Sequence, residues 1–230
     1  MEPTSAQKIL RDYFDRQEVY EELGPKVEVI IRAALKNASI QPHSITFRTN
    51  GAECLRKKIQ DHPERRYENL TDLTDLLGVR IITYYVDEVD AVWEVMKKEF
   101  DLDEKNCVDK RETDNPNEFG YASLHLVASL GESRTRLSEY SRFSDMKFEI
   151  QIRTILQHAW AEIEHDHIYK TKSTVPPDMR RIFSRISAAL EGADLDFQRV
   201  RNVATERSRR RVVDQGDCTV TYAPNSTCRR

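Results

Sequence analysis

The hydrophobic pattern changes its period in the middle of residues 146–170, which predicts a strand that runs directly into a helix. In the first half, apolar and polar residues alternate strictly, as they do in a strand with one buried face. The apolar members of this alternation are Phe148, Ile150 and Ile152. From Thr154 onward, apolar residues recur at three- and four-residue steps, which predicts a helix with Thr154 as its N-cap. The polar residues of the strand should then project together from its other face.

These polar side chains, with those of the following helix, form a candidate active-site wall. Glu149, Gln151 and Arg153 share one strand face, and His158 and Glu162 lie one helical turn apart. A charged strand face can also simply contact water, and the pattern alone does not separate the two interpretations. A zinc site is disfavoured, because HExxH spacing is absent and the cysteines lie elsewhere in the chain.

The same patterns divide the rest of the chain into helices, strands and polar connections. Helices are predicted at 5–22, 25–36, 67–77 and 87–100, after Gly51, and from Pro176 onward, where an apolar stripe covers 182–200. Strands are predicted at 43–48, 78–86 and 122–130. The segments 101–118 and 131–145 are polar and turn-rich, so we expect the first to be a mobile loop.

Three further positions carry candidate chemistry. A strand that ends at Arg48, followed by a turn and a helix, can form a phosphate pocket, because amide donors at a helix start and nearby cations favour an anion. Basic helix residues there are equally compatible with a solvated surface. Asp75 precedes a buried strand and lies five positions before Arg80, where a carboxylate can hold Mg²⁺. Tyr121 lies where the polar loop meets a strand, so it is either a stacking platform for a base or a half-buried tyrosine.

Composition narrows the class of protein. The 230 residues can bury one substantial core, and a net charge of −3 gives no general argument for nucleic-acid or membrane binding. The sequence has no apolar stretch of membrane-spanning length and no signal-like start, which predicts a cytoplasmic protein. Four cysteines are scattered without CxxC spacing, which predicts reduced thiols: Cys54, Cys107, Cys218 and Cys228.

Four motifs, in this order, resemble the synthetase domain of the RelA/SpoT family and in particular its small, single-domain alarmone synthetases. They are FRTNGAECLRKKI, LTDLLGVRI, FGYASLHLV, and FEIQIRTILQHAWAEIEH followed by YK, within Ser44 to Lys170. The resemblance implies an α+β fold, a nucleotidyltransferase-like mixed β-sheet flanked by helices. It also implies transfer of the β,γ-pyrophosphate of ATP to the 3′-hydroxyl of GDP or GTP, which gives (p)ppGpp.

The resemblance assigns roles to the residues already singled out. Asp75 would hold Mg²⁺, with Glu149 as a second metal ligand or as the base that takes the proton from the 3′-hydroxyl. The residues implied in ATP binding are Arg48, Lys58 and Arg80. Those implied around the acceptor nucleotide are Tyr121, which would stack on guanine, and His125, Gln151 and Arg153. His158 and Glu162 would support this wall from behind.

The expected organisation follows from both the pattern and the resemblance. It comprises an N-terminal helical layer at 1–42, a synthetase-like core at 43–172, a C-terminal helix at 173–206 and a basic, disordered tail at 207–230. Small members of the family are often homotetramers, so a homo-oligomer is expected. No HD-type metal motif is visible, which predicts a synthetase without a hydrolase partner.

Three departures from the family pattern leave the acceptor open. Asn50 and Asn117 stand where basic residues are common, and Cys54 stands where a serine is common. One alternative is a toxic relative that pyrophosphorylates tRNA 3′ ends or adenine nucleotides, with an antitoxin partner and with the basic run 207–211 as a track for tRNA. A second alternative is a catalytically silent module that binds nucleotides.

Overall fold

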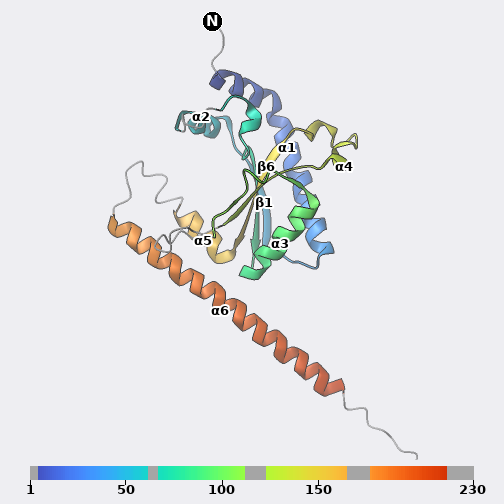
Figure 1. The fold of residues 1–230 in the computed structure, drawn as a ribbon, viewed down its shortest axis with the longest axis vertical. Helices are drawn as coiled ribbons and strands as arrows, with labels where there is room; N and C mark the ends of the chain where they lie inside the picture. The colour runs from blue at the N-terminus through green and yellow to red at the C-terminus, as the bar shows by residue number, and fades with distance from the viewer. Residues whose placement is uncertain (1–4, 62–66, 112–122, 165–176, 217–230) are drawn as a thin grey trace, which may run out of the picture.

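The computed structural model describes residues 5–61, 67–111, 123–164 and 177–216, and its centre is a six-stranded mixed sheet (Figure 1). The strands run in the order β1-β2-β6-β5-β3, and β4 pairs with β5 off this path. Their bounds are Ser44–Thr49 (β1), Leu77–Thr83 (β2), Asp101–Leu102 (β3), Val108–Asp109 (β4), Leu124–Ser129 (β5) and Lys147–Thr154 (β6). The β2–β6 pair is parallel and the other pairs are antiparallel, which confirms the predicted α+β class with a mixed sheet.

Helices flank the sheet on both sides (Figure 1). Their bounds are Ser5–Asn37 (α1), Ala52–Asp61 (α2), Val86–Glu99 (α3), Glu132–Thr135 (α4), Ile155–Glu164 (α5) and Pro177–Gly216 (α6), with short 3₁₀ turns at Leu70–Asp72 (η2) and Ser141–Phe143 (η3). The long α1 and α3 cover one face, α5 packs near one end of the other face, and α6 lies beyond α5. Much of the second face, over β1, β2 and β6, is therefore left open.

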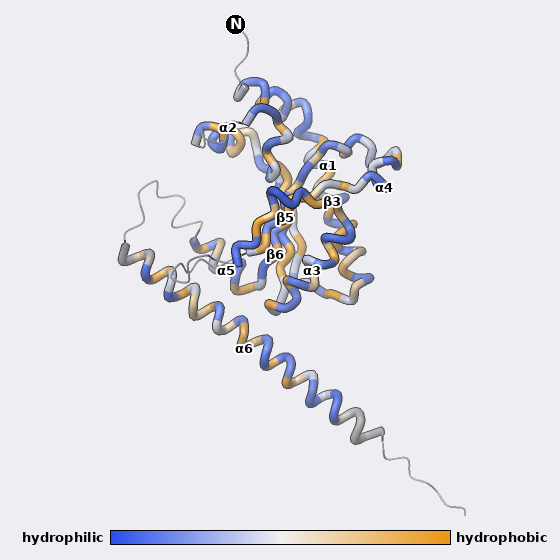
Figure 2. Tube along the Cα trace, viewed as in Figure 1, coloured by the Kyte–Doolittle hydropathy of each residue, from blue (hydrophilic) through white to orange (hydrophobic). Residues whose placement is uncertain are grey.

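The core lies between the sheet and helices α1 and α3, where Figure 2 shows the most hydrophobic stretches of the chain. Burial alternates without a break along β6, as predicted, and the same alternation begins β2. Each residue that faces α1 and α3 is buried, whereas Glu149, Gln151 and Arg153 keep partial exposure on the open face. The period-2 pattern therefore places three polar side chains where a ligand can reach that face.

The N-terminal layer is one helix, so the prediction of two helices separated before Pro25 is wrong. A proline inside a helix removes one hydrogen bond and costs about 3 kcal/mol. The helix continues because apolar residues on both sides of Pro25 enter the same core: Tyr20, Leu23, Val27, Ile30 and Ile31. Gly24 serves the same packing, since a Cβ there would lie 2.5 Å from Cδ2 of Phe47 on β1.

The predicted helix at 67–77 is also absent, although the leucines that suggested it are buried. Only η2 is helical there, and Asp72 Oδ2 accepts hydrogen bonds of 2.9 Å from the amides of both Glu68 and Asn69. This carboxylate closes a tight turn in place of a longer helix. The leucines at 70, 73 and 77 then contact the core from a turn and from the start of β2.

Two further differences concern segments expected to be irregular. The polar segment 101–118 contains the two-residue strands β3 and β4, although its residues 112–118 lie outside the described part. Helix α6 continues through residues 207–216, where a disordered tail is predicted. Pairs four residues apart support this last stretch, because Arg210 donates to Glu206 and Ser208 to the carbonyl of Ala204. None of the described helices is long and apolar enough to cross a membrane.

Candidate active site

The register of the sheet places the polar residues of four strands in rows on the open face. Arg48 lies opposite Gly78, and Gly78 lies opposite Glu149. Because Gly78 has no side chain, the space between the guanidinium and the carboxylate stays open. The next row runs from Thr46 through Arg80 to Gln151 and then to His125 on β5. The predicted strand wall is thus assembled from four strands.

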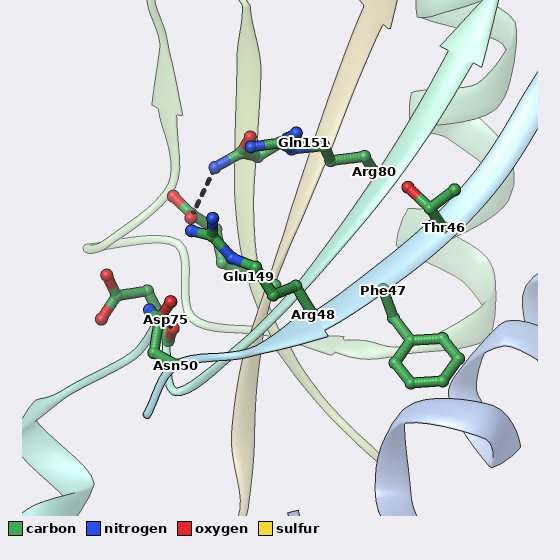
Figure 3. A pocket seen from close by; sticks show the side chains of 9 residues that line it. Thr46, Phe47, Arg48, Asn50, Asp75, Arg80, Glu149 and Gln151 are labelled. Atoms are coloured by element: carbon green, nitrogen blue, oxygen red, sulfur yellow. Dashed lines mark hydrogen bonds between the residues drawn. The ribbon is translucent and has the colours of Figure 1, made fainter. Parts of the chain in front are cut away.

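The first pocket, here termed the arginine pocket, lies over these rows (Figure 3). Its charged and amide-bearing lining residues are Arg48, Asn50, Asp75, Arg80, Glu149 and Gln151. In Figure 3 the side chains of Arg48 and Arg80 extend across the sheet toward Glu149 and Gln151, whereas Phe47 points away toward α1. Two guanidinium groups on one side and two carboxylates on the other make this pocket suitable for a phosphorylated ligand with a metal ion.

The second pocket, here termed the lysine pocket, has a volume of about 570 Å³. Lysines from three segments line it: Lys58 from α2, and Lys105 and Lys110 from the loops around β4. His125 from β5 lines it as well. Asp75 and Glu149 belong to both pockets, so these two carboxylates mark the place where the pockets meet.

Glu149 is fixed by hydrogen bonds on both carboxylate oxygens. His125 Nδ1 lies 2.6 Å from Oε1, and Gln151 Nε2 donates to Oε2 at 2.9 Å. Burial acts to raise the pKa of Glu149, but the hydrogen bond and charge of His125, the bond from Gln151 and the charge of Lys110 outweigh it and hold the pKa below its usual range. The residue is therefore an ionised carboxylate in a fixed orientation.

Asp75 is placed by a different set of contacts. Lys58 Nζ lies 2.6 Å from its Oδ2, and each of these side chains is little more than a quarter exposed. Asn50 Nδ2 donates to the backbone oxygen of Asp75 at 2.6 Å. The backbone N–H of Asn50 donates to the backbone oxygen of Leu76 at 2.8 Å. Tyr13 in turn donates to the Asn50 carbonyl at 2.7 Å. Asn50, which departs from the family pattern, thus joins the end of β1 to the turn that carries Asp75.

Helix α5 contacts the arginine pocket through its residue Glu162. Arg80 Nη1 donates to Glu162 Oε1 at 2.7 Å, and His158 Nδ1 lies 3.8 Å from the same oxygen. Burial lowers the pKa of His158, and the nearby Arg80 and Arg153 lower it further, against the opposing charge of Glu162. His158 is thus disfavoured as a cation, and Glu162 is the group that balances Arg80.

The structure brings most of the predicted site residues together around the two pockets. Lys58, expected with ATP, lies in the lysine pocket beside His125, and Gln151, expected with the acceptor, lies in the arginine pocket. Arg153 lines neither pocket among the described residues. Tyr121 and Asn117 lie outside the described residues.

Sequence reasoning missed three residues of this region. Lys105 and Lys110 enter the lysine pocket from a polar segment without a recognisable period, so no pattern could have indicated them. Ser123 lies two residues before His125, and its hydroxyl contacts the His125 ring. Residues two apart in a strand share one face, so the predicted strand at 122–130 could have indicated this contact. The described residues contain no group of three or more His, Cys, Asp or Glu that could hold a metal ion.

Comparison with known sequences finds a family and named relatives. The family described as "Region found in RelA / SpoT proteins" matches residues 47–174. The GTP pyrophosphokinase YwaC of Bacillus subtilis is 34% identical over 129 residues, which cover 56% of this chain and 53% of that relative. The GTP pyrophosphokinase YjbM of the same organism is 31% identical over 137 residues, 58% of this chain and 60% of the relative. The chain thus matches little more than half the length of these curated relatives.

Comparison with solved structures finds the same architecture. The crystal structure of small alarmone synthetase 1 from Bacillus subtilis aligns with a TM-score of 0.69 at 24% identity, covering 85% of this chain and 99% of that one. The structure of that synthetase bound to its product pppGpp aligns with a TM-score of 0.65 at 25% identity, covering 84% and 95%. The mixed sheet and its flanking helices are therefore shared with these proteins.

Proposed function

The chain belongs to the RelA/SpoT family, and from this membership and the geometry of its site we propose that it transfers the β,γ-pyrophosphate of ATP to the 3′-hydroxyl of GDP or GTP. The observation that carries the proposal is that two cation-lined pockets share Asp75 and Glu149. A transferase with two nucleotide substrates needs such a junction, because the reacting groups must meet beside the same fixed residues. Both curated relatives are named as GTP pyrophosphokinases, in agreement with this activity.

The arginine pocket takes ATP. Guanidinium groups bind phosphate oxygens through paired donors and also stack on the faces of aromatic rings, so Arg48 and Arg80 can contact either end of the nucleotide. Glu162 holds Arg80 in place before ATP arrives, which reduces the ordering that binding requires. The polyphosphate of ATP then points toward Asp75 and Glu149.

The lysine pocket takes the acceptor. Lys105 and Lys110 place two cations beside His125, close to the shared carboxylates. They offer positive charge for the diphosphate or triphosphate of GDP or GTP, which compensates for the two cations missing at Asn50 and Asn117. The 3′-hydroxyl of the acceptor then faces Glu149 from the side opposite to ATP.

In the reaction, the 3′-oxygen of the acceptor forms a bond to the β-phosphorus of ATP. The bond between this phosphorus and the oxygen that bridges it to the α-phosphate breaks, and AMP leaves with that oxygen and its electron pair. Glu149 accepts the proton of the 3′-hydroxyl, because it lines both pockets and is already ionised. The arginine and lysine side chains stabilise the charge that spreads over the phosphate oxygens.

Asp75 and Glu149 also form a suitable pair of ligands for Mg²⁺. Protein sites for this ion usually supply one or two carboxylates, and the substrate phosphates and water complete the coordination. When bound, Mg²⁺ neutralises charge on the phosphate oxygens. In the protein without nucleotide, Lys58 neutralises Asp75 instead, so Lys58 must change its partner, and a phosphate oxygen is the natural new one.

A mass-spectrometric assay of the purified full chain tests the activity. The protein receives ATP and Mg²⁺ with GDP, GTP, ATP and deacylated tRNA as competing acceptors, and a reaction with EDTA serves as the control. We expect pyrophosphorylated GDP or GTP and an equal amount of AMP. A protein that binds nucleotides but gives no pyrophosphorylated product with any acceptor would be the catalytically silent module instead.

One observation favours a tRNA acceptor as the second candidate function. Arg207, Arg209 and Arg210 are exposed on a continuous stretch of α6, so this end of the helix carries cations that could contact a phosphate backbone. Product on tRNA alone in the assay above, weakened by Arg209→Glu together with Arg210→Glu, would support this function. Product on GDP or GTP that these two substitutions leave unchanged would exclude it.

We also propose that α6 joins two copies of the chain. One side of α6 faces the body, where Asp194 bonds to Thr154 at 2.6 Å, Phe183 contacts the ring of Trp160 edge to face, and Arg201 pairs with Asp87 and packs over the ring of Tyr85. Its outward side carries apolar residues that are 42–66% exposed: Ile182, Ile186, Phe197 and Val200. A two-fold axis would bury this stripe against itself, since such an interface pairs one surface patch with its own copy.

The mass of the purified chain tests this interface. Light scattering of the purified chain should give a mass of at least two copies, and Phe197→Glu should shift it to one copy. The control variant Ser138→Glu changes an exposed residue outside α6 and should not change the mass. A monomeric wild-type protein at micromolar concentration would contradict the proposal.

A further inference from the structure

Five side chains form one continuous series of hydrogen bonds across the open face of the sheet. Ser123 Oγ lies 2.6 Å from His125 Nε2, and His125 Nδ1 lies 2.6 Å from Glu149 Oε1. On the other side, Glu149 Oε2 accepts from Gln151 Nε2 at 2.9 Å, and Gln151 Oε1 accepts from Arg153 Nη2 at 3.0 Å. Glu149 is the central member, with two residues on each side of it.

The two end members differ from the three central ones in where they lie. His125, Glu149 and Gln151 line the pockets, whereas Ser123 and Arg153 line neither of the two described above. Ser123 is only 5% exposed. Arg153 is partly buried, and its Nε is shielded from solvent without a hydrogen-bond partner among the described residues. Neither end lines a pocket proposed for a nucleotide, so each acts on the site through its neighbour.

Chemistry fixes the direction of three of the four bonds in this series. A guanidinium group only donates, so the oxygen of the Gln151 amide must face Arg153 and its nitrogen must face Glu149. An ionised carboxylate only accepts, so the hydrogen of the His125 ring lies on Nδ1. In the neutral ring with this hydrogen, Nε2 accepts from the hydroxyl of Ser123. Ser123 thus bonds to the ring nitrogen of His125 that does not contact Glu149. Arg153 likewise bonds to the side-chain oxygen of Gln151, whose nitrogen contacts Glu149.

We propose that Ser123 and Arg153 are positioning residues that hold the two oxygens of Glu149 from opposite sides, Ser123 through His125 and Arg153 through Gln151. This inference rests on the proposed function, in which Glu149 faces the 3′-hydroxyl of the acceptor. A carboxylate held on both oxygens cannot rotate away from the hydroxyl, and small losses of alignment are costly in rate. Outer partners that orient a functional group commonly contribute about 10-fold to 100-fold to activity.

The kinetic test uses Ser123→Ala and Arg153→Met. Each should lower kcat about 10-fold to 100-fold, while the KM values for ATP and for the acceptor stay within about twofold, because neither residue lines a pocket. Ser123→Thr and Arg153→Lys keep a donor at each end and should recover most of kcat. Matched exposed controls, Ser138→Ala and Arg136→Met, should behave as wild type. Thermal unfolding of each variant identifies any that lose activity by losing their fold.

Two results would overturn the inference. One is an unchanged kcat in both Ser123→Ala and Arg153→Met, and the other is a rise of the KM values with kcat preserved. An unchanged kcat would contradict only the positioning role, since the wild-type protein would still transfer pyrophosphate. A wild-type protein without transferase activity would instead contradict the proposed function.

A second measurement does not depend on activity. Long-range ¹H–¹⁵N spectra of the folded protein distinguish the two tautomers of a histidine ring, and the loss of signals in His125→Gln assigns those of His125. A hydrogen on Nδ1 is expected in the wild-type protein, because Glu149 lies 2.6 Å from that nitrogen. The Nε2–H tautomer would reverse the direction of the bonds and overturn the inference, whatever the activity of the protein.

Discussion

In the arginine pocket, Arg80 is held by Glu162 at 2.7 Å, whereas in the lysine pocket Lys58 is held at 2.6 Å by Asp75, a carboxylate that the proposed reaction itself uses. The partner of Arg80 lies on α5, outside both pockets, so Arg80 can bind a phosphate without releasing it. In the proposed reaction, Lys58 exchanges Asp75 for a phosphate oxygen of a substrate. The donor side is therefore built in advance, and the acceptor side must rearrange its charges when substrates bind.

The shared carboxylates should give the largest effect, because they belong to both sides of this comparison. Asp75→Asn or Glu149→Gln should lower kcat by about a thousandfold, since each removes a charge at the point of transfer while keeping the size of the side chain. Steady-state kinetics with ATP and GDP measures the change. If kcat stays the same and the KM rises for one substrate only, the substituted carboxylate acts in one pocket only.

The cations of the two pockets should be separable by the substrate that each affects. Arg80→Met should raise the KM for ATP about 10-fold to 100-fold and leave the KM for the acceptor nearly unchanged, because a lost hydrogen bond to a charged group costs about 1.5–3 kcal/mol. Lys110→Met should do the reverse. Both values come from initial rates with each nucleotide varied in turn. If the two variants affect the same substrate, the assignment of one pocket to each nucleotide is wrong.

Glu162→Gln sharpens the comparison with a smaller effect. The amide keeps a hydrogen bond to Arg80 but loses the charge, and the side chains of this pair are 32% and 53% exposed, so solvent screens much of their attraction. A rise in the KM for ATP of about threefold is expected, which corresponds to less than 1 kcal/mol. An equal rise in the KM for the acceptor would show that α5 acts on both pockets. Calorimetric titration with an ATP analogue gives an independent value for the change in affinity.

The wall of this site was predictable from the sequence because alternation is a local property. Glu149, Gln151 and Arg153 were expected on one strand face, and the register of β2 and β6 confirms it. The leucines of 67–77 were correctly expected to be buried, although a turn carries them in place of a helix. A burial pattern with three-residue spacing does not distinguish the two, and the side chain of Asp72 decides between them.

The division between the pockets was not predictable, because it depends on how distant segments approach one another. Lys58 lies on α2, and only the packing of that helix decides which pocket its side chain enters. Lys105 and Lys110 reach the site through strands of two residues, which are too short to leave a period in the sequence. The same holds for Pro25, since its helix continues only because the core accepts residues from both sides of it.

The smallest expected effect concerns the wall of the lysine pocket. The hydrogen bond from Lys147 to Asp103, 2.7 Å long, is the main cause that holds the pKa of Asp103 below its usual range, with Asn106 contributing as well. A carboxyl group with a lowered pKa in the folded state adds stability above its unfolded pKa, and this contribution disappears as the pH falls through the folded pKa. Lys147→Met should therefore lower the melting temperature by a few degrees near pH 7 and by less near pH 3. An equal loss at both pH values would mean that packing of the lysine stem, and not the ion pair, holds the turn that carries Lys105.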